Sequence, residues 1–325
     1  MPRKLRSFTI ADMIIVTGGA GFIGSNLIKG LNSQGITQII VVDDLSDGKK
    51  HLNLNRLKIA DYIDKNDLLN QLDHFKNVQT IFHQGACSNT METDGAFMMR
   101  NNFTFSKELL QFALKNQIDF LYASSASVYG DGTSGFRESI DCEYPLNIYA
   151  YSKFLFDQYV REILRTNKSP SSQILGLRYF NVYGYQENHK GTMASVAFHL
   201  MNQLNHNEPL KLFEGSESFK RDFVFVDDVV DINLFFFEKK LSGIYNCGTG
   251  KSRSFLDVAN ILRAINPSAL IETIPFPSAL LKKYQTFTEA NLTSLRDSGY
   301  TKSSVSLEAG IQRYYEQFQK TGGLF

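Results

Sequence analysis

Tyr149 and Lys153 are the side chains in this sequence whose types and spacing could do acid–base chemistry. They lie at the two ends of Tyr149-Ala150-Tyr151-Ser152-Lys153, and on a helix this spacing puts both on one face, one turn apart. A phenol has a pKa of about 10, so it acts as a base near neutral pH only if that pKa is lowered. A lysine ammonium one turn away favours the phenolate. The pentapeptide alone is also typical of a solvated helix face, so the rest of the chain must decide.

A glycine-rich loop near the start of the chain predicts a binding site for a dinucleotide. The expected order is strand, loop, helix and strand, over residues 13–17, 18–24, 25–33 and 38–42. Gly18, Gly21 and Gly24 would let the backbone approach a pyrophosphate, and the following helix would offer free N–H groups and a positive dipole. Asp43 and Asp44 end the second strand, where an acidic side chain can accept hydrogen bonds from a ribose. A purely structural turn is the alternative.

Strands and helices continue to alternate along the first half of the chain. Further strands are expected at 57–60, 80–84, 120–125 and 174–179, with helices at 97–115 and 149–165. This alternation predicts an α/β fold with a Rossmann-like, doubly wound parallel sheet and right-handed crossovers. Ligands then bind outside the carboxyl ends of the strands. Candidate side chains follow the expected strand ends: the glycine loop, Asp43, Asp61, Gly85–Ser88, Ser124–Ser125 and Asn181.

The pattern of the sequence changes at about residue 181, where the expected loops become longer and more polar. We therefore expect a dinucleotide-binding domain over 13–180 and a smaller C-terminal lobe, mainly 181–325, that holds a substrate. Segments around 222–248 again resemble a helix and a strand and are expected to return to the first domain. Residues 1–12 are interpreted as an appendage.

Composition excludes several classes of function. The net charge is +1 over 325 residues, with 43% hydrophobic and 21% charged residues, so there is no global field to hold nucleic acid or an acidic membrane. No apolar stretch approaches a membrane span or a signal peptide. The three cysteines are odd in number and far apart, which favours a reducing compartment, the cytoplasm, over a disulfide framework. No spacing of histidines suggests a metal site.

Five motifs together resemble the extended short-chain dehydrogenase/reductases. They are T-G-G-A-G-F-I-G at 17–24, S-S-A-S-V-Y-G at 124–130, Y-x-x-x-K at 149–153, R-Y-F-N-V-Y-G at 178–184 and R-D-F-V-F-V-D-D-V at 221–229. Further segments are similar to the nucleotide-sugar epimerases of this family that act on carbon 6 of an ADP-linked heptose: 59–65, 83–88, 188–199, 212–216, 219–224 and 284–288. The resemblance covers essentially the whole chain.

The resemblance implies inversion of carbon 6 by oxidation to a transient ketone, followed by reduction from the opposite face. The hydride would pass to and from a tightly held nicotinamide dinucleotide. Inversion requires proton donors on two sides, and the resemblance makes Tyr149 one and Lys190 the other. Lys153 would support Tyr149 and bind the nicotinamide ribose, and Ser125 would hold the reacting oxygen. For Lys190, a solvated lysine or a phosphate contact is the alternative.

The resemblance also assigns residues to the cofactor, expected as one NADP per subunit with NAD as the alternative. Asp43 favours an unmodified ribose and so NAD, and Asp44 adds a second negative charge. Lys50 and Lys65 could offset this repulsion of a 2′-phosphate. Asp61 would meet the adenine edge, although a strand-end cap explains it equally. The other implied contacts are Gly18, Gly21, Phe22, Ile23, Gly24, Gln84, Gly85, Ala86, Cys87, Ser88, Asn101 and Val182.

A further set of residues matches substrate-binding positions of the family. They are Asn181, Thr192, His199, Phe213, Glu214, Gly215, Ser216, Arg221 and Tyr284. Arg221 can fork onto a diphosphate, whereas His199 and Phe213 could equally be core residues. The expected partner is an ADP-heptose on the route to lipopolysaccharide core, and a homopentamer is implied by resemblance alone.

Two other functions remain open at this point. A UDP-hexose 4-epimerase or a dehydratase could use the same scaffold, although the neighbours of Ser125 lack the acid that eliminates water. A non-catalytic dinucleotide-binding protein would commonly lack the tyrosine or the lysine, and both are present here.

Overall fold

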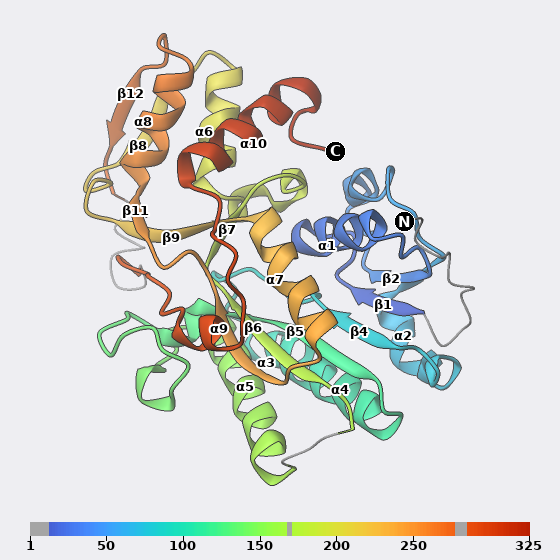
Figure 1. Cartoon of the computed structure of the whole chain (residues 1–325). Coiled ribbons are helices and arrows are strands. Elements are labelled where there is room, and N and C mark those ends of the chain that lie inside the picture. Colours follow the sequence, from blue (N-terminus) through green and yellow to red (C-terminus); the bar gives the residue numbers. More distant parts are fainter. Residues whose placement is uncertain (1–12, 168–170, 277–284) are drawn as a thin grey trace.

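A seven-stranded parallel sheet forms the centre of the computed structural model, which describes residues 13–167, 171–276 and 285–325 (Figure 1). The strand order is β10-β6-β5-β4-β1-β2-β3. The bounds are β1 Ile14–Thr17, β2 Ile39–Asp43, β3 Asp61–Asp64, β4 Thr80–His83, β5 Asp119–Ser125, β6 Ile174–Tyr179 and β10 Gly243–Cys247. The chain order reverses between β1 and β4, and ligands of such sheets bind at this switch point. The predicted Rossmann-like fold is therefore confirmed.

Helices cover both faces of the sheet, because successive side chains of a strand point to opposite faces. Ile14 and Val16 pack in one core cluster with α1 (Phe22–Ser33) and α7 (Val226–Lys239). Ile15 packs in the opposite cluster, which draws on three other helices. These are α2 (Lys65–Gln71), α4 (Phe105–Lys115) and α5 (Ile148–Thr166). Burial on both faces explains the nearly continuous apolar sequence of the strands.

The third strand does not lie where the sequence suggested. A strand was expected at 57–60, with Asp61 at its carboxyl end, but β3 begins at Asp61 and ends at Asp64. Asp61 pairs with Ile40 near the start of β2, and Asp64 pairs with Asp43 at its end. Asp61 is therefore exposed at the amino edge of the sheet, so the predicted strand at 57–60 with Asp61 at its carboxyl end is wrong, and the predicted contact of Asp61 with an adenine stays a prediction. The short apolar run before it resembles a strand, but only register against β2 decides which residues pair.

The expected helix at 97–115 is interrupted by a π-helical turn. It consists of α3 (Gly95–Met99), the turn Arg100–Thr104 and α4. Such turns are frequent at functional sites. Here the turn carries Asn101 and Asn102.

The remaining elements form a second layer beyond the carboxyl ends of the strands (Figure 1). β7 (Asn181–Tyr183), β9 (Lys220–Phe225) and β11 (Ser252–Ser254) make a three-stranded sheet, and β8 (Leu210–Phe213) pairs with β12 (Ile271–Ile274). A separate core joins them to α6 (Val196–Asn205), α8 (Phe255–Ile265) and α10 (Leu307–Thr321), and α9 (Thr293–Asp297) contacts β10. β10 pairs with β6, and α7 packs on α1. Within the described ranges, no helix is long and apolar enough to cross a membrane.

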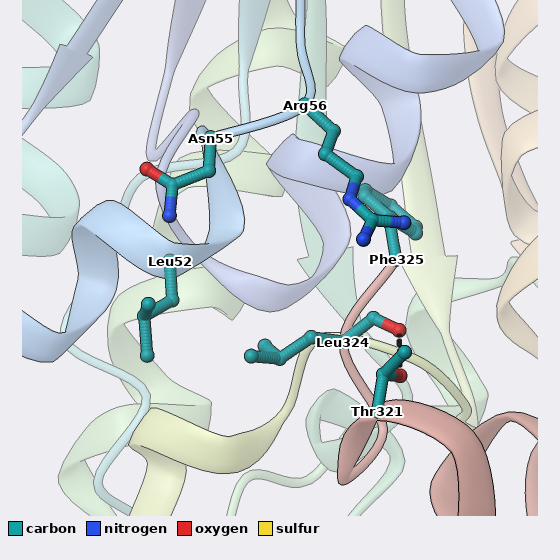
Figure 2. A pocket seen from close by; sticks show the side chains of 6 residues that line it. All are labelled: Leu52, Asn55, Arg56, Thr321, Leu324 and Phe325. Atoms are coloured by element: carbon teal, nitrogen blue, oxygen red, sulfur yellow. Dashed lines mark hydrogen bonds between the residues drawn. The ribbon is translucent and has the colours of Figure 1, made fainter.

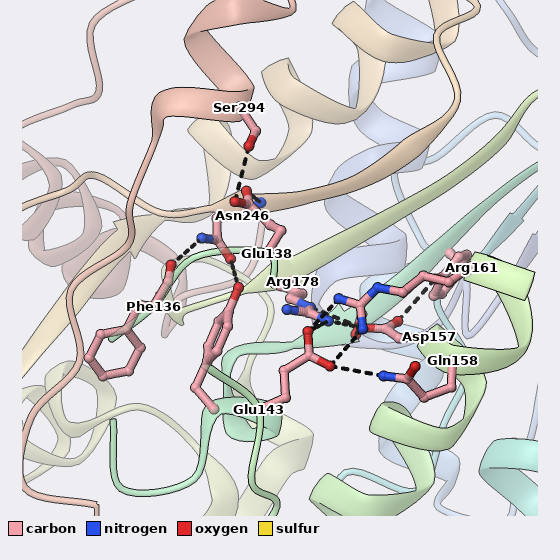
Figure 3. A network of polar contacts seen from close by, with 12 residues as sticks. Phe136, Glu138, Glu143, Asp157, Gln158, Arg161, Arg178, Asn246 and Ser294 are labelled. Carbon is pink, nitrogen blue, oxygen red and sulfur yellow. Dashed lines mark hydrogen bonds and ion pairs between the residues drawn. The ribbon is translucent and has the colours of Figure 1, made fainter. Parts of the chain in front are cut away.

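A buried ionic network fixes α5 against the sheet (Figure 3). The guanidinium of Arg178, on β6, donates to Asp157 of α5 over 2.9 Å and to Glu143 over 2.6 Å. Asp157 also accepts from Ser124 at 2.9 Å, and Glu143 accepts from Arg161 at 2.7 Å. Arg178, Asp157 and Glu143 have fully buried side chains. Because Asp157 lies one turn beyond Lys153, this network sets where the N-terminal turns of α5 sit.

Beside this network, Tyr129 ties the loop after β5 to β10. Its hydroxyl donates to Asn246 over 2.6 Å, and Asn246 donates in turn to the carbonyl of Phe136. The Glu138 carboxylate accepts from the backbone N–H of Asn246 at 2.7 Å and from the Ser294 hydroxyl at 3.1 Å.

Glu143→Gln should destabilise the protein by about 3–5 kcal/mol, because it leaves buried guanidinium charge without its carboxylate. Urea unfolding followed by circular dichroism measures this change. The control is Glu162→Gln on α5, whose pair with Arg165 is exposed and should contribute nothing measurable. Equal stability of Glu143→Gln and wild type would contradict the structural role of the network.

Candidate active site

The glycine loop after β1 has the geometry of a diphosphate cradle. Gly18 has φ +66°, and a Cβ there would lie 2.6 Å from the Gly85 amide nitrogen. A Cβ on Gly24 would lie 2.1 Å from the Gly18 carbonyl oxygen, so neither position accepts a side chain. α1 begins at Phe22 with Gly21 as its N-cap and no capping side chain. Its first N–H groups are therefore available to an anion, and these residues fit a dinucleotide.

Both aspartates after β2 are paired with a lysine. The buried Asp43 carboxylate accepts the Ala20 amide over 2.8 Å and forms an ion pair with Lys50. Asp44 pairs with Lys65 over 3.0 Å. Hydrogen bonds from Ser46, followed by the contact with Lys65, hold the pKa of Asp44 well below its usual range. Each negative charge at the expected ribose position thus has a positive neighbour.

The loop after β4 is held to α5 by Asn102. Its side chain accepts from the Cys87 amide at 2.8 Å and donates to the Cys87 carbonyl at 2.9 Å and to Ser152 at 3.1 Å. Ser152 donates to the carbonyl of Tyr149 over 2.7 Å. Sequence reasoning chose the neighbour Asn101, which is half-buried in the same π-helical turn. It missed Asn102, because nothing in a pair of adjacent asparagines shows which one faces inward.

Ser125, Tyr149 and Lys153 meet at the junction of β5 and α5. Ser125 is the last residue of β5, and Asn147 caps α5 by accepting from the Ala150 amide at 2.8 Å. Lys153 is 6% exposed and its ammonium donates to the Ala123 carbonyl over 2.9 Å. The predicted tyrosine, serine and lysine are therefore on neighbouring elements.

Burial has the largest effect on the ionisation of this group. Burial raises the pKa of the Tyr149 phenol, and a hydrogen bond with Ser125 acts in the opposite direction. Burial also lowers the pKa of Lys153 to about 8, against the attraction of Asp157. We expected Lys153 to lower the pKa of Tyr149, but the ammonium is directed to a carbonyl and desolvation is the larger effect. A positive charge brought by a ligand would favour the phenolate further.

Lys190 lies on the short 3₁₀ segment η7 (Asn188–Met193), near the start of α1. Its ammonium is 5.2 Å from the centre of the Phe22 ring. Burial lowers the pKa of Lys190, and the buried carboxylate of Glu187 opposes this. In the described part of the chain no hydrogen bond joins Lys190 to Tyr149. The lysine therefore sits above the glycine loop, with its proton more easily lost than in an exposed lysine.

The expected substrate residues divide into two groups. Asn181 and Arg221 share the three-stranded sheet, whereas Phe213 ends β8 and 214–216 follow it. Arg221 is 5% exposed and its guanidinium is 5.6 Å from the Phe255 ring centre. Thr192 is exposed on η7 and His199 is half-buried on α6, and within the described residues no hydrogen bond links either side chain to that sheet. Val182 is half-buried in β7, and Tyr284 lies outside the described residues.

A cavity of about 180 Å³ lies elsewhere, between residues 52–56 and the C-terminal tail (Figure 2). Leu52, Asn55, Arg56, Thr321, Leu324 and Phe325 line it. None of the residues discussed above contributes to it, so it has no part in the chemistry.

The comparisons agree with this geometry. The chain is 56% identical over 316 residues, 96% of its length and 99% of the relative's, to an ADP-L-glycero-D-manno-heptose-6-epimerase of Brachyspira hyodysenteriae. The crystal structure of the Helicobacter pylori enzyme of the same name is 28% identical, with a TM-score of 0.80 and coverage of 95% of this chain and 97% of that one. A Thermotoga maritima UDP-glucose 4-epimerase with UDP-glucose is 27% identical, with a TM-score of 0.81 and coverage of 95% and 99%. The model of the NAD dependent epimerase/dehydratase family matches residues 14–248, and the chain belongs to that family.

Proposed function

We propose that this chain is an epimerase that inverts carbon 6 of the heptose in ADP-D-glycero-D-manno-heptose, giving ADP-L-glycero-D-manno-heptose. The observation that carries this proposal is the identity of 56% over nearly the full length of a relative with that name. The meeting of Ser125, Tyr149 and Lys153 supports it, and so does a second lysine, Lys190, near the start of α1, because inversion through a ketone needs proton transfer on two sides of the carbon.

The cofactor is proposed to be NADP, one per subunit, with NAD as the alternative. A bound nicotinamide ring would take the hydride from carbon 6 and return it. The N–H groups at the start of α1 would hold the diphosphate, and Lys153 the nicotinamide ribose. The pairs Asp43–Lys50 and Asp44–Lys65 would face the adenosine ribose, where the lysines can contact a 2′-phosphate.

Proton transfer is assigned to Tyr149 and Lys190. Tyr149 would exchange a proton with the substrate oxygen while the Ser125 hydroxyl holds that oxygen. Lys190 would do the same on the other face, since burial brings its pKa closer to neutrality. Lys190 lies over Phe22, at the start of α1, on the side of the glycine loop where the nucleotide is proposed to bind.

The sugar nucleotide is proposed to bind between the two layers. Residues 13–180, with segments around 222–248, would form the cofactor-binding domain, and the rest of 181–325 would form the substrate lobe. Arg221 would hold the diphosphate of the ADP-sugar. A cytoplasmic homopentamer that supplies lipopolysaccharide core synthesis completes the proposal.

A UDP-hexose 4-epimerase is the second candidate, favoured by the structural likeness to the Thermotoga enzyme. That likeness is at 27% identity, far below the 56% of the heptose epimerase relative, and fold alone does not select a substrate.

Incubation of the wild-type protein with ADP-D-glycero-D-manno-heptose should give a mixture of both carbon-6 epimers. Proton NMR measures the ratio of the two epimers over time. Tyr149→Phe should slow this reaction by about 10²–10⁴-fold, because it removes a general acid–base group. Tyr151→Phe, two residues away and 42% exposed, is the matched control and should keep wild-type activity. A wild-type enzyme that leaves the heptose unchanged and converts UDP-hexoses would replace the proposal with the second candidate.

Lys190→Arg distinguishes an acid–base lysine from a phosphate-binding one. Arginine keeps the charge but does not release its proton near neutral pH. If Lys190 transfers a proton, Lys190→Arg and Lys190→Ala should both lose about 10²-fold or more in kcat. An active Lys190→Arg beside an inactive Lys190→Ala would reduce Lys190 to a binding role. Lys211→Arg, exposed on β8, serves as the control.

Asp44→Asn should strengthen NADPH binding relative to NADH, because it frees Lys65 for a 2′-phosphate. One partly exposed charge contact corresponds to roughly fivefold in affinity. Fluorescence titration of both reduced cofactors measures the ratio, with Asp73→Asn, whose pair with Lys76 is exposed, as the control. An unchanged ratio would contradict the assignment of these pairs to the ribose.

A further inference from the structure

Two buried amide side chains, Asn53 and Gln186, clamp the start of the loop that carries Lys190. Asn53 ends the 3₁₀ segment η2 (Gly48–Asn53) and donates to the Gln186 carbonyl over 3.2 Å. The Gln186 side chain donates back to the Asn53 carbonyl, also over 3.2 Å. Asn53 is 1% exposed and Gln186 0%. Reciprocal bonds of this kind, shielded from water, fix the two backbones relative to each other.

The backbone of Gln186 is strained, and the clamp accounts for its persistence. Its φ is +73°, a region that costs a non-glycine residue of the order of 1 kcal/mol or more. The backbone N–H of Gln186 also donates to the Gly323 carbonyl over 2.9 Å. The C-terminal tail around Gly323 lies beside residues 52–56, as Thr321, Leu324 and Phe325 show in Figure 2. A strained residue held by three buried hydrogen bonds, four positions before a proposed proton donor, indicates that the course of this loop is specified.

Asn53 also contacts both the glycine loop and η7. Its amide group donates to the Ala20 carbonyl over 2.9 Å and contacts Nδ1 of His189 over 3.1 Å. Burial, with Lys50 and Lys190 nearby, lowers the pKa of His189 to about 4, so the ring is neutral at pH 7 and Nδ1 can share one of the two amide hydrogens of Asn53 with a carbonyl. Polar contacts of Asn53 therefore link the diphosphate cradle to the residue before Lys190.

The same short segment reaches the ribose end of the cofactor site. Lys50, three residues before Asn53, pairs with Asp43, and Asp43 accepts from the Ala20 amide. Ala20 is thus held on its N–H side by Asp43 and on its carbonyl side by Asn53. The glycine loop and Asn53 are therefore joined through a single residue, Ala20.

We propose that Asn53 and Gln186 are positioning residues that couple occupancy of the dinucleotide site to the placement of the Lys190 loop. This inference rests on the proposed function for the role of Lys190, but the coupling itself concerns only the cofactor and the loop.

Hydrogen–deuterium exchange tests the coupling without any sugar substrate. NADPH, and NADH in a parallel series, should slow exchange of peptides covering 184–195 in the wild-type protein by on the order of tenfold. In Asn53→Ala this effect should disappear while protection of the glycine-loop peptides remains. Asn55→Ala, an exposed asparagine two residues away, is the matched control and should behave as wild type.

Two results would overturn the proposal. One is a wild-type loop whose exchange does not respond to either cofactor. The other is cofactor-dependent protection of 184–195 that survives in Asn53→Ala. Inactivity of the wild type on the heptose would instead overturn the proposed function and leave the exchange result standing.

Gln186→Gly keeps the test valid if Asn53→Ala folds poorly. Glycine adopts a φ of +73° without strain, so this variant loses only the side-chain bond. It should retain its fold by circular dichroism, lose part of the loop protection and show a kcat reduced by about tenfold with little change in KM, since misplacement of a reacting group affects the chemical step. Wild-type kcat together with wild-type loop protection would contradict the clamp.

Discussion

The buried charge of Arg178 is the constraint on which the catalytic arrangement depends. A guanidinium on a central strand cannot remain without partners, because desolvation of an unpaired charge costs several kcal/mol. The carboxylates of Asp157 and Glu143 meet this need. Asp157 lies on α5, and Glu143 also accepts from Arg161 of α5, so these contacts hold the helix against β5 and β6. Lys153 and Tyr149, on the first two turns of that helix, are thereby placed at the carboxyl edge of the sheet.

Burial acts on the two proposed proton donors in opposite directions along the pH scale. It raises the pKa of Tyr149 and lowers that of Lys190, because in each case it disfavours the charged form. The phenol thus holds its proton more strongly and the ammonium less strongly than in water. Only local hydrogen bonds and charges, from Ser125 for the tyrosine and Glu187 for the lysine, oppose these shifts. A positive charge on a bound ligand near Tyr149 would oppose the upward shift of the tyrosine pKa.

At the proposed cofactor end of the site, each acidic side chain is paired with a lysine. Asp43 and Asp44 would repel a phosphate, but Lys50 and Lys65 lie against them. The segment that brings Lys50 to Asp43 also brings Asn53 to the Lys190 loop, so cofactor recognition and the position of the loop share one short element. One segment can make both contacts because it lies near the switch point of the sheet, where the ends of β1 and β4 leave room for several loops to meet.

The sequence alone predicted the family and the Rossmann-like sheet, both confirmed, because motifs and periodicity are local properties. It also predicted Asp43 and Ser125 at strand ends and Tyr149 and Lys153 on one helix, as the structure has them. It failed where the answer depends on contacts between distant segments. The register of β3 against β2 puts the strand at Asp61–Asp64 and not at 57–60, and the π-helical turn buries Asn102, which the sequence did not single out. The clamp between Asn53 and Gln186 joins residues 133 positions apart. Such pairings carry no sequence signature, because an asparagine or glutamine looks the same whether it is solvated or buried, and only the tertiary structure decides which.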